Sequence, residues 1–280
     1  MTVNEWFFFK YQAARTLGRM MRWLTNWRDV WSSYRVNLPP PPLRFRSGLT
    51  LHHGPHDSPV SLLREVFGER HYRRHVECPS EGVLIDLGAN IGAVTLDLAS
   101  RSRRLRVHAY EPNPSAHRVL RRNVEANGLT DRVTVHDEAV GRGSGELRLW
   151  TNVNSMTATS HHDSPPTPEA VATLVPLVDL NEVVRRIGGE AVALLKIDTE
   201  GGEADTLEGA TPATLGALRQ VVLEYHDTLC PNASGRCLKV LEEAGFRCVV
   251  RPLNANHGLI YARRPRGRQS GVDEKTSGRD

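Results

Sequence analysis

Three carboxylates follow one short apolar stretch in the segment "LLKIDTEGGE", residues 194–203. Asp198, Glu200 and Glu203 come directly after residues 194–197, which have the composition of a buried strand. Charged groups are rarely buried without partners, so a strand that ends in this way needs a reason. One reason is structural, because acids stabilise the first turn of a following helix, and this is our expectation for Glu203. The other is a catalytic or metal-binding edge at the carboxyl end of a parallel strand.

A glycine-rich turn earlier in the chain predicts a ligand site. In "VLIDLGANIGAVT", residues 83–95, Asp86 ends an apolar strand, and the turn before the next helix contains Gly88, Asn90 and Gly92. Such glycines let a ligand approach the backbone at a helix N-terminus. The spacing D-x-G-x-x-x-G differs from the dinucleotide fingerprint. An acid directly before the turn would repel a phosphate, but it suits a cationic amine.

Acids after the next two strands extend this pattern. "HAYEPNP", residues 108–114, places Glu111 where folds of this type hold a ribose diol, with Asn113 beside it. "HDEAVG", residues 136–141, offers Asp137 or Glu138 to the exocyclic amine of an adenine, and the backbone of Ala139 to its ring. Acidic residues in ordinary turns, without a ligand, would give the same sequence. Taken together, the residues predict a site for S-adenosylmethionine, with Asp86 at its amino-acid end and Glu111 on the ribose hydroxyls.

Strands and helices alternate through the middle of the chain, which predicts an α/β fold with a parallel sheet and helices on both faces. The predicted strands are 83–85, 106–110, 133–136, 192–197 and 219–225, followed by an antiparallel pair near 246–251 and 257–263. The predicted helices are 91–101, 114–127, 180–187, one starting near Gly202, and 234–245. We expect 145–150 to be an edge strand. Residues 151–175, which contain His161 and His162, are expected to be a long irregular lid or acceptor-binding loop.

The two ends of the chain differ from the middle. Apolar residues at helical spacing predict one amphipathic helix over the first 35 residues, and residues 38–43, "LPPPPL", predict a stiff spacer. The helix is basic and rich in tryptophan. We favour packing of its apolar stripe on the domain or on a partner subunit, and the alternative is that it lies on an anionic membrane surface. We therefore divide the chain into an extension (1–50), a catalytic domain (51–262) and a disordered basic tail (263–280).

Charge is distributed unevenly along the chain. The formal net charge is +4 and the isoelectric point is about 9.0, but the basic excess lies in the two ends, and the domain is mildly acidic. A nucleic-acid enzyme usually carries its basic surface on the catalytic domain, so we expect no polynucleotide partner. The four cysteines show no metal-binding spacing, and there is no secretory signal or membrane-spanning run. These features favour a cytoplasmic protein, peripheral to a membrane at most.

The chain resembles the FkbM family of S-adenosylmethionine-dependent methyltransferases. The matching segments, in chain order, are "IDLGANIGAVT", "YEPNP", "EAVG", "LKIDTEGGEADTLEGA" and "VVLEYH". The resemblance implies a Rossmann-like class I methyltransferase with a mostly parallel, seven-stranded sheet. It also implies, in most cases, methylation of a hydroxyl oxygen on a saccharide or other natural-product intermediate.

Methyl transfer to an alcohol requires a base or a cation beside the acceptor oxygen. Glu224 and His226 lie on one face of the strand "VVLEYHD", and Asp198 ends the neighbouring strand. We therefore expect these three residues to hold Mg²⁺ or Mn²⁺, in a placement similar to that of catechol-type O-methyltransferases. No lysine follows Asp198 closely to serve as a base of the catechol kind. Without a metal, His226 or Glu200 would be the base, and the rate would fall as His226 is protonated near pH ~6.5. The alternatives are an N- or C-methyltransferase without a metal, and a non-catalytic membrane-surface protein.

Overall fold

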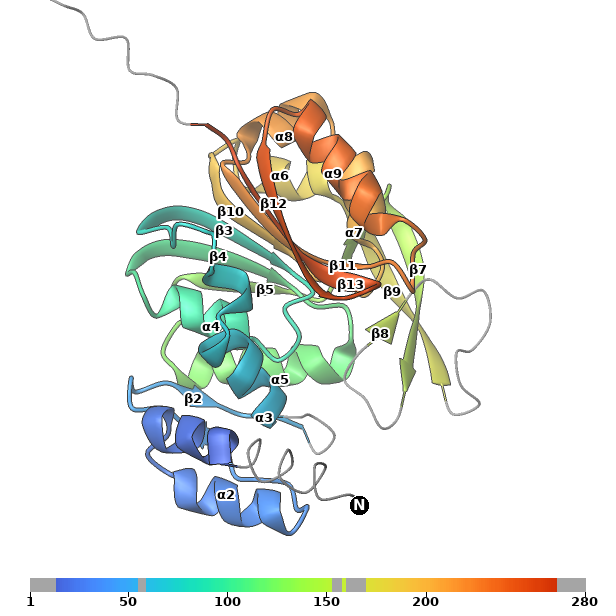
Figure 1. Cartoon of the computed structure of the whole chain (residues 1–280). Coiled ribbons are helices and arrows are strands. Elements are labelled where there is room, and N and C mark those ends of the chain that lie inside the picture. The colour runs from blue at the N-terminus through green and yellow to red at the C-terminus, as the bar shows by residue number, and fades with distance from the viewer. Residues whose placement is uncertain (1–13, 55–58, 153–157, 160–169, 266–280) are drawn as a thin grey trace, which may run out of the picture.

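The computed structural model describes residues 14–54, 59–152, 158–159 and 170–265. Its centre is a sheet of seven strands in the order β12-β13-β11-β10-β3-β4-β5 (Figure 1). In chain order these strands are β3 (Glu81–Leu87), β4 (Arg104–Tyr110), β5 (Val133–His136), β10 (Val192–Ile197), β11 (Gln220–His226), β12 (Arg247–Asn254) and β13 (His257–Arg263). The pairs β11–β10, β10–β3, β3–β4 and β4–β5 are parallel, and β13 pairs antiparallel with both β11 and β12. The predicted mostly parallel sheet and its antiparallel end are confirmed.

Helices cover both faces of this sheet (Figure 1). One face carries α3 (Pro59–Leu62), α4 (Ala93–Ala99) and α5 (Pro114–Ala126), and the other carries α6 (Leu180–Arg186), α7 (Glu203–Glu208), α8 (Pro212–Ala217) and α9 (Ala233–Glu243). Alternate strand side chains point to opposite faces, so Leu84 and Leu194 pack in one hydrophobic cluster while Ile85 and Leu195 pack in the other. Helix α8 was not among the predicted helices; Thr211 caps it by accepting a hydrogen bond from the backbone N–H of Thr214.

A second sheet lies beside the carboxyl ends of the parallel strands, and it corrects two predictions. Its strands are β6 (Ala139–Gly141), β7 (Gly145–Asn152), β8 (Ala158–Thr159) and β9 (Ala170–Asp179), in the order β6-β9-β7-β8. The stretch 145–150 belongs to β7, an inner strand rather than an edge. Within 151–175 all the described residues lie in strands: 151–152 end β7, 158–159 form β8, and 170–175 begin β9, which pairs along the whole length of β7. Residues 153–157 and 160–169, including His161 and His162, lie outside the described part.

The N-terminal extension is two helices rather than the predicted single one. Residues 14–23 are helical, the helix ends at Leu24, and α2 (Trp27–Arg35) follows. The break occurs because residues 24–26 bind the strand β1 (Leu43–Arg44) instead of continuing the helix. Leu24 forms a bridge with Phe45, and the Asn26 side chain donates to the carbonyl of Pro42 and accepts from the N–H of Arg44. A second short strand, β2 (Thr50–Leu51), pairs with β1.

The apolar stripe of the extension packs against the domain. Met20, Leu24 and Val30 are buried in the same hydrophobic cluster as Leu84 and Leu194, and Trp23, Trp27 and Trp31 pack around its edge. In Figure 1 these helices lie below the layer formed by α3, α4 and α5. For residues 14–35, packing on the domain, one of the two arrangements that we favoured, is therefore observed. None of the described helices is long and apolar enough to cross a bilayer. Of the predicted disordered tail, residues 266–280 lie outside the described part.

Candidate active site

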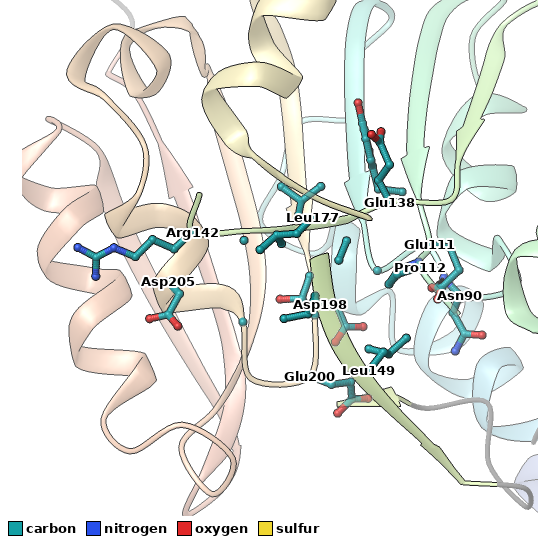
Figure 2. Close-up of a pocket in the computed structure, with 18 residues that line it drawn as sticks. Asn90, Glu111, Pro112, Glu138, Arg142, Leu149, Leu177, Asp198, Glu200 and Asp205 are labelled. Atoms are coloured by element: carbon teal, nitrogen blue, oxygen red, sulfur yellow. Dashed lines mark hydrogen bonds between the residues drawn. The ribbon is translucent and has the colours of Figure 1, made fainter. Parts of the chain in front are cut away.

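A cavity of about 330 Å³ opens at the carboxyl ends of β3, β4 and β10, beneath the second sheet. At one end it is lined by the turn after β3 and by Glu111 and Glu138, and at the other by Asp205 and Arg142 (Figure 2). Asp198 and Glu200 lie between these ends, opposite Leu149 and Leu177 of the second sheet. Of the predicted site residues, Gly88, Asn90, Glu111, Glu138, Ala139, Asp198 and Glu200 line the cavity.

The turn after β3 requires glycine because it touches the loop after β10. Gly88 has a φ of 69°, and a Cβ atom there would lie 1.8 Å from the carbonyl oxygen of Asp198. Asn90 also has a positive φ, of 50°. Its Oδ1 atom and the Thr199 hydroxyl are buried without a hydrogen-bond partner among the described residues. Both residues line the cavity, so these polar atoms fit a ligand that supplies hydrogen bonds.

Glu111 is almost fully buried at the end of β4. Its carboxylate accepts hydrogen bonds from the backbone N–H groups of Asn90, at 2.7 Å, and Asn113, at 2.8 Å. Burial raises the pKa of Glu111 to about 7, although these two hydrogen bonds oppose the shift. Asn113 itself caps α5, accepting from the N–H of Ser115, and it is not part of the cavity wall. It therefore orients Glu111 rather than touching a ligand.

Of the two acids predicted to contact the adenine, Glu138 lies in the cavity wall and Asp137 does not. Glu138 lines the cavity and forms an ion pair with Arg186 at 2.5 Å, and the buried Ala139 beside it begins β6. Asp137 is exposed and lies outside the cavity wall. The chain turns from β5 into β6 at this point, so consecutive side chains face opposite ways. Asp137 is thus removed from the cofactor residues.

Asp86 lies beneath the turn rather than on the cavity wall. It is 0% exposed, accepts a hydrogen bond from the Thr95 hydroxyl at 2.6 Å and lies 3.1 Å from the ammonium group of Lys196. Lys196 also donates to the carbonyls of Leu87 and Gly88. The pair therefore fixes the shape of the turn, and the predicted contact of Asp86 with a cofactor amine is not available in this arrangement. Gly92 likewise serves packing: it caps α4, and a Cβ atom there would meet Leu120 at 2.6 Å.

Asp198 is held by residues that the sequence analysis missed. The Tyr72 hydroxyl, from the short 3-10 helix His71–Arg73, lies 2.8 Å from Asp198 and also contacts Glu224, which in turn contacts His257. One hydroxyl proton serves one acceptor at a time, so Asp198 and Glu224 share it or one of them is protonated. Burial, followed by repulsion from Glu224, raises the pKa of Asp198 to about 7. For Glu224, hydrogen bonds from His257 and Tyr72 outweigh burial and lower the pKa.

The predicted metal triad of Asp198, Glu224 and His226 does not come together as one group. Potential ligand atoms lie within 4.8 Å of one another in two other sets, Asp198–Glu200–His226 and Glu224–His226–His257. The reason is local: Glu224 turns toward Tyr72, in a short 3-10 helix that was not predicted, and toward His257 at the start of β13, which was not among the predicted site residues. Neither Glu224 nor His226 lines the cavity.

His226 is surrounded by acids. Burial by itself would lower the pKa of His226, but Glu203, Asp198 and Glu200 raise it to about 9. Its Nδ1 lies 3.1 Å from Glu203 and its Nε2 lies 3.6 Å from Glu200. A protonated imidazole has no free lone pair, so the predicted loss of activity as His226 is protonated near pH ~6.5 does not fit this environment. Glu203 occupies the first turn of α7 and accepts from the N–H groups of Thr199 and Gly201, which confirms its structural role.

A glycine turn after the first parallel strand, a buried acid after the second and a cavity at the carboxyl edge define a nucleotide-type ligand site in an open α/β sheet. Comparison with known proteins agrees with this class. The family model described as the methyltransferase FkbM domain matches residues 86–248. The 31-O-demethyl-FK506 methyltransferase FkbM of Streptomyces tacrolimicus is 31% identical, over 80% of this chain and 97% of that protein. Methyltransferase 1 of Beauveria bassiana is 26% identical, over 68% of this chain and 81% of that protein.

The chain therefore belongs to the FkbM family of S-adenosylmethionine-dependent methyltransferases. Among solved structures, that of methyltransferase FkbM from Methylobacillus flagellatus is similar with a TM-score of 0.49 and 16% identity. The match covers 72% of this chain and 53% of that one.

Proposed function

We propose that the protein transfers the methyl group of S-adenosylmethionine to a hydroxyl group of a small acceptor, a saccharide or another natural-product intermediate. The cofactor supplies an electrophilic methyl group. Glu111 would accept hydrogen bonds from its ribose hydroxyls, and Gly88 and Asn90 would lie along its amino-acid end. Glu138 and the backbone of Ala139, which line the same cavity, would bind its adenine.

The observation that carries the proposal is the position of Asp198. Its carboxylate is the acid that ends β10, in the middle of the cavity between the cofactor residues and the Arg142 end. An alcohol must lose its proton close to the moment of attack, and a carboxylate whose pKa lies near neutrality is suited to accept it. Tyr72 and Lys196 hold this carboxylate in place, at 2.8 Å and 3.8 Å. Glu200, beside Asp198 in the cavity wall, would orient the acceptor.

The wall of the cavity favours an acceptor without negative charge. Asp198, Glu200 and Asp205 line the acceptor end, where Arg142 is the only basic residue of the described wall and lies 3.8 Å from Glu208. Leu147, Leu149 and Leu177 of the second sheet provide an apolar surface opposite. A neutral polyol with an apolar face fits both features. The relative from Streptomyces tacrolimicus is named as a methyltransferase of 31-O-demethyl-FK506, which supports an oxygen acceptor.

Metal assistance by Mg²⁺ or Mn²⁺ is the second way to activate the hydroxyl. The observation in its favour is the set Asp198, Glu200 and His226, whose potential ligand atoms lie within 4.8 Å of one another. Against it, Lys196 and a protonated His226 already place positive charge beside these acids. A chelator separates the two mechanisms. Activity that disappears with chelator and returns with Mg²⁺ supports the ion, and full activity in excess chelator supports Asp198 alone.

The test is transfer of labelled methyl from S-adenosylmethionine to a panel of polyols, saccharides and amines. Asp198→Asn should lower turnover on a hydroxyl acceptor about a hundredfold or more, because the variant cannot take the proton. Cofactor affinity by calorimetry should change little. Asp131→Asn, which alters an exposed acid outside the cavity, is the matched control. Transfer only to nitrogen or carbon acceptors would establish the N- or C-methyltransferase alternative. No cofactor binding would favour the non-catalytic one.

A further inference from the structure

A second cavity, of about 360 Å³, lies between the N-terminal extension, the segment 63–73 and the end of α4. Five arginines line it, and we call it the arginine pocket: Arg22, Arg46, Arg70, Arg73 and Arg101. They come from four separate stretches of the chain. Its wall shares no residue with that of the catalytic cavity.

The arginine pocket has more positive charge than the described acids neutralise. Asp97 is the only acid in its described wall, and its two carboxylate oxygens are taken by Arg73, at 2.6 Å, and Arg101, at 2.7 Å. Within the described part of the chain, no carboxylate lies within ion-pair distance of Arg22, Arg46 or Arg70. Like charges at short range repel one another unless an anion separates them.

Arg73 is partly buried, whereas the other four arginines are exposed and line the cavity. The Arg73 side chain is 11% exposed, and burial together with repulsion from Arg101 and Arg70 lowers its pKa despite the contact with Asp97. Arg46 donates to the carbonyl of Met21. Arg70 has a left-handed backbone, with φ 54° and ψ 44°, a conformation that costs about 1 kcal/mol for such a residue. Strain of this kind persists where the surrounding structure imposes it, and Arg70 lines the pocket in this conformation.

The remaining wall is apolar and aromatic. Trp23, Phe45, Leu49 and Phe67 line it, and the rings of Phe45 and Phe67 lie 4.4 Å apart. Guanidinium groups bind phosphate oxygens through paired N–H donors, which makes a cluster of arginines the usual protein site for phosphate. A cluster over an apolar wall also accepts the less polar part of a ligand that carries phosphate.

We propose that the arginine pocket binds a phosphate-bearing anion. The chemistry is the same whether the phosphate belongs to a free compound or to the headgroup of an anionic lipid. In the lipid case we expect an electrostatic contact, because Met20, Leu24 and Val30, in the described part of the extension, are buried in the protein. This inference does not depend on the proposed methyl transfer.

The experiment compares the wild-type chain with the double variant Arg22→Gln/Arg70→Gln. The matched control is Arg35→Gln/Arg44→Gln, which removes the same charge from exposed arginines of the extension outside the pocket. Circular dichroism and thermal melting show that each variant is folded. Calorimetry measures binding of inorganic phosphate and pyrophosphate. Flotation measures binding to vesicles of phosphatidylcholine with and without phosphatidylglycerol.

The wild type and the control should bind pyrophosphate alike, and the pocket variant about tenfold or more weakly, since charged hydrogen bonds are lost. Loss of vesicle binding in the pocket variant alone, without binding of the free phosphates, assigns the site to a lipid headgroup. Binding of the free phosphates without vesicle binding assigns it to a soluble ligand. The proposal is overturned if the wild type binds none of these probes, or if the control loses as much affinity as the pocket variant.

Discussion

At the scale of single residues, Glu111 carries the cofactor assignment. Its two oxygens already accept backbone hydrogen bonds, so ribose hydroxyls would complete the shell of a buried carboxylate. Glu111→Ala should lower the affinity for S-adenosylmethionine about tenfold or more, the loss expected for charged hydrogen bonds. Glu125→Ala, on the exposed face of α5, is the control. Calorimetry measures both, and equal affinities would place the cofactor elsewhere.

The pKa of Glu111 also predicts how stability depends on pH. The folded protein raises this pKa from 4.5 to about 7, so the protonated form is favoured by folding. The contribution to stability is complete below pH ~4.5 and is lost as the pH rises to about 7. Relative to Glu111→Gln, the wild type should therefore lose on the order of 3 kcal/mol of unfolding free energy over this range. Urea unfolding at several pH values measures the difference. A constant difference would show that the pKa is ordinary.

Lys196 provides a third prediction at this scale. It is buried between Asp86 and Asp198 and binds the carbonyls of the glycine turn. Lys196→Met keeps the volume but leaves Asp86 without its cation, so the free energy of unfolding should fall by about 3–5 kcal/mol. The exposed Lys239→Met should change it by little more than 0.5 kcal/mol. Denaturant unfolding gives both values, and similar values for the two variants would contradict a central role for Lys196.

At the scale of elements, the helix at residues 14–23 behaves as part of the domain. Met20 is 0% exposed, whereas Met21, one residue further, is 46% exposed. Both positions are helical, so the effect of alanine on helix propensity is the same in Met20→Ala and Met21→Ala and does not contribute to the difference between them. Met20→Ala should destabilise the protein by about 2–5 kcal/mol, and Met21→Ala by far less. Thermal and denaturant unfolding measure this. Equal effects would mean that the extension is not packed on the domain in solution, and would reopen the membrane-surface interpretation.

The second sheet is the other element that shapes function. β6 comes directly after β5 in the chain, and β9 comes directly before α6. Both strands therefore lie beside the carboxyl ends of the parallel strands. Their side chains Leu177 and Ala139 thereby close one side of the cavity. Only residues 145–150 of this sheet were predicted as a strand, and β9, which pairs with β7 along its whole length, was placed mostly within an irregular segment.

At the scale of the whole molecule, the active site is assembled from segments far apart in the chain. Tyr72 meets Asp198 across 126 residues and Glu224 across 152. The segment that carries Tyr72 lies in the chain between the extension and β3, and Tyr72 packs in the same hydrophobic cluster as Met20 and Leu24, so the extension is coupled to Asp198 through shared packing. Folding of the N-terminal part and formation of the site are therefore linked.

The sequence alone determined the parallel strands, the glycine turn, Glu111, Asp198 and the family, since each depends on local periodicity or on a contiguous motif. A lysine inside the apolar strand of "LLKID" was visible as well, although its partners were not. Only the tertiary structure decided that Asp86 faces Lys196, that Glu224 turns to Tyr72 and His257, and that the extension breaks at Leu24. These outcomes depend on which distant segments pack together. A side chain's neighbours along the chain do not specify which of several partners it meets across a folded core.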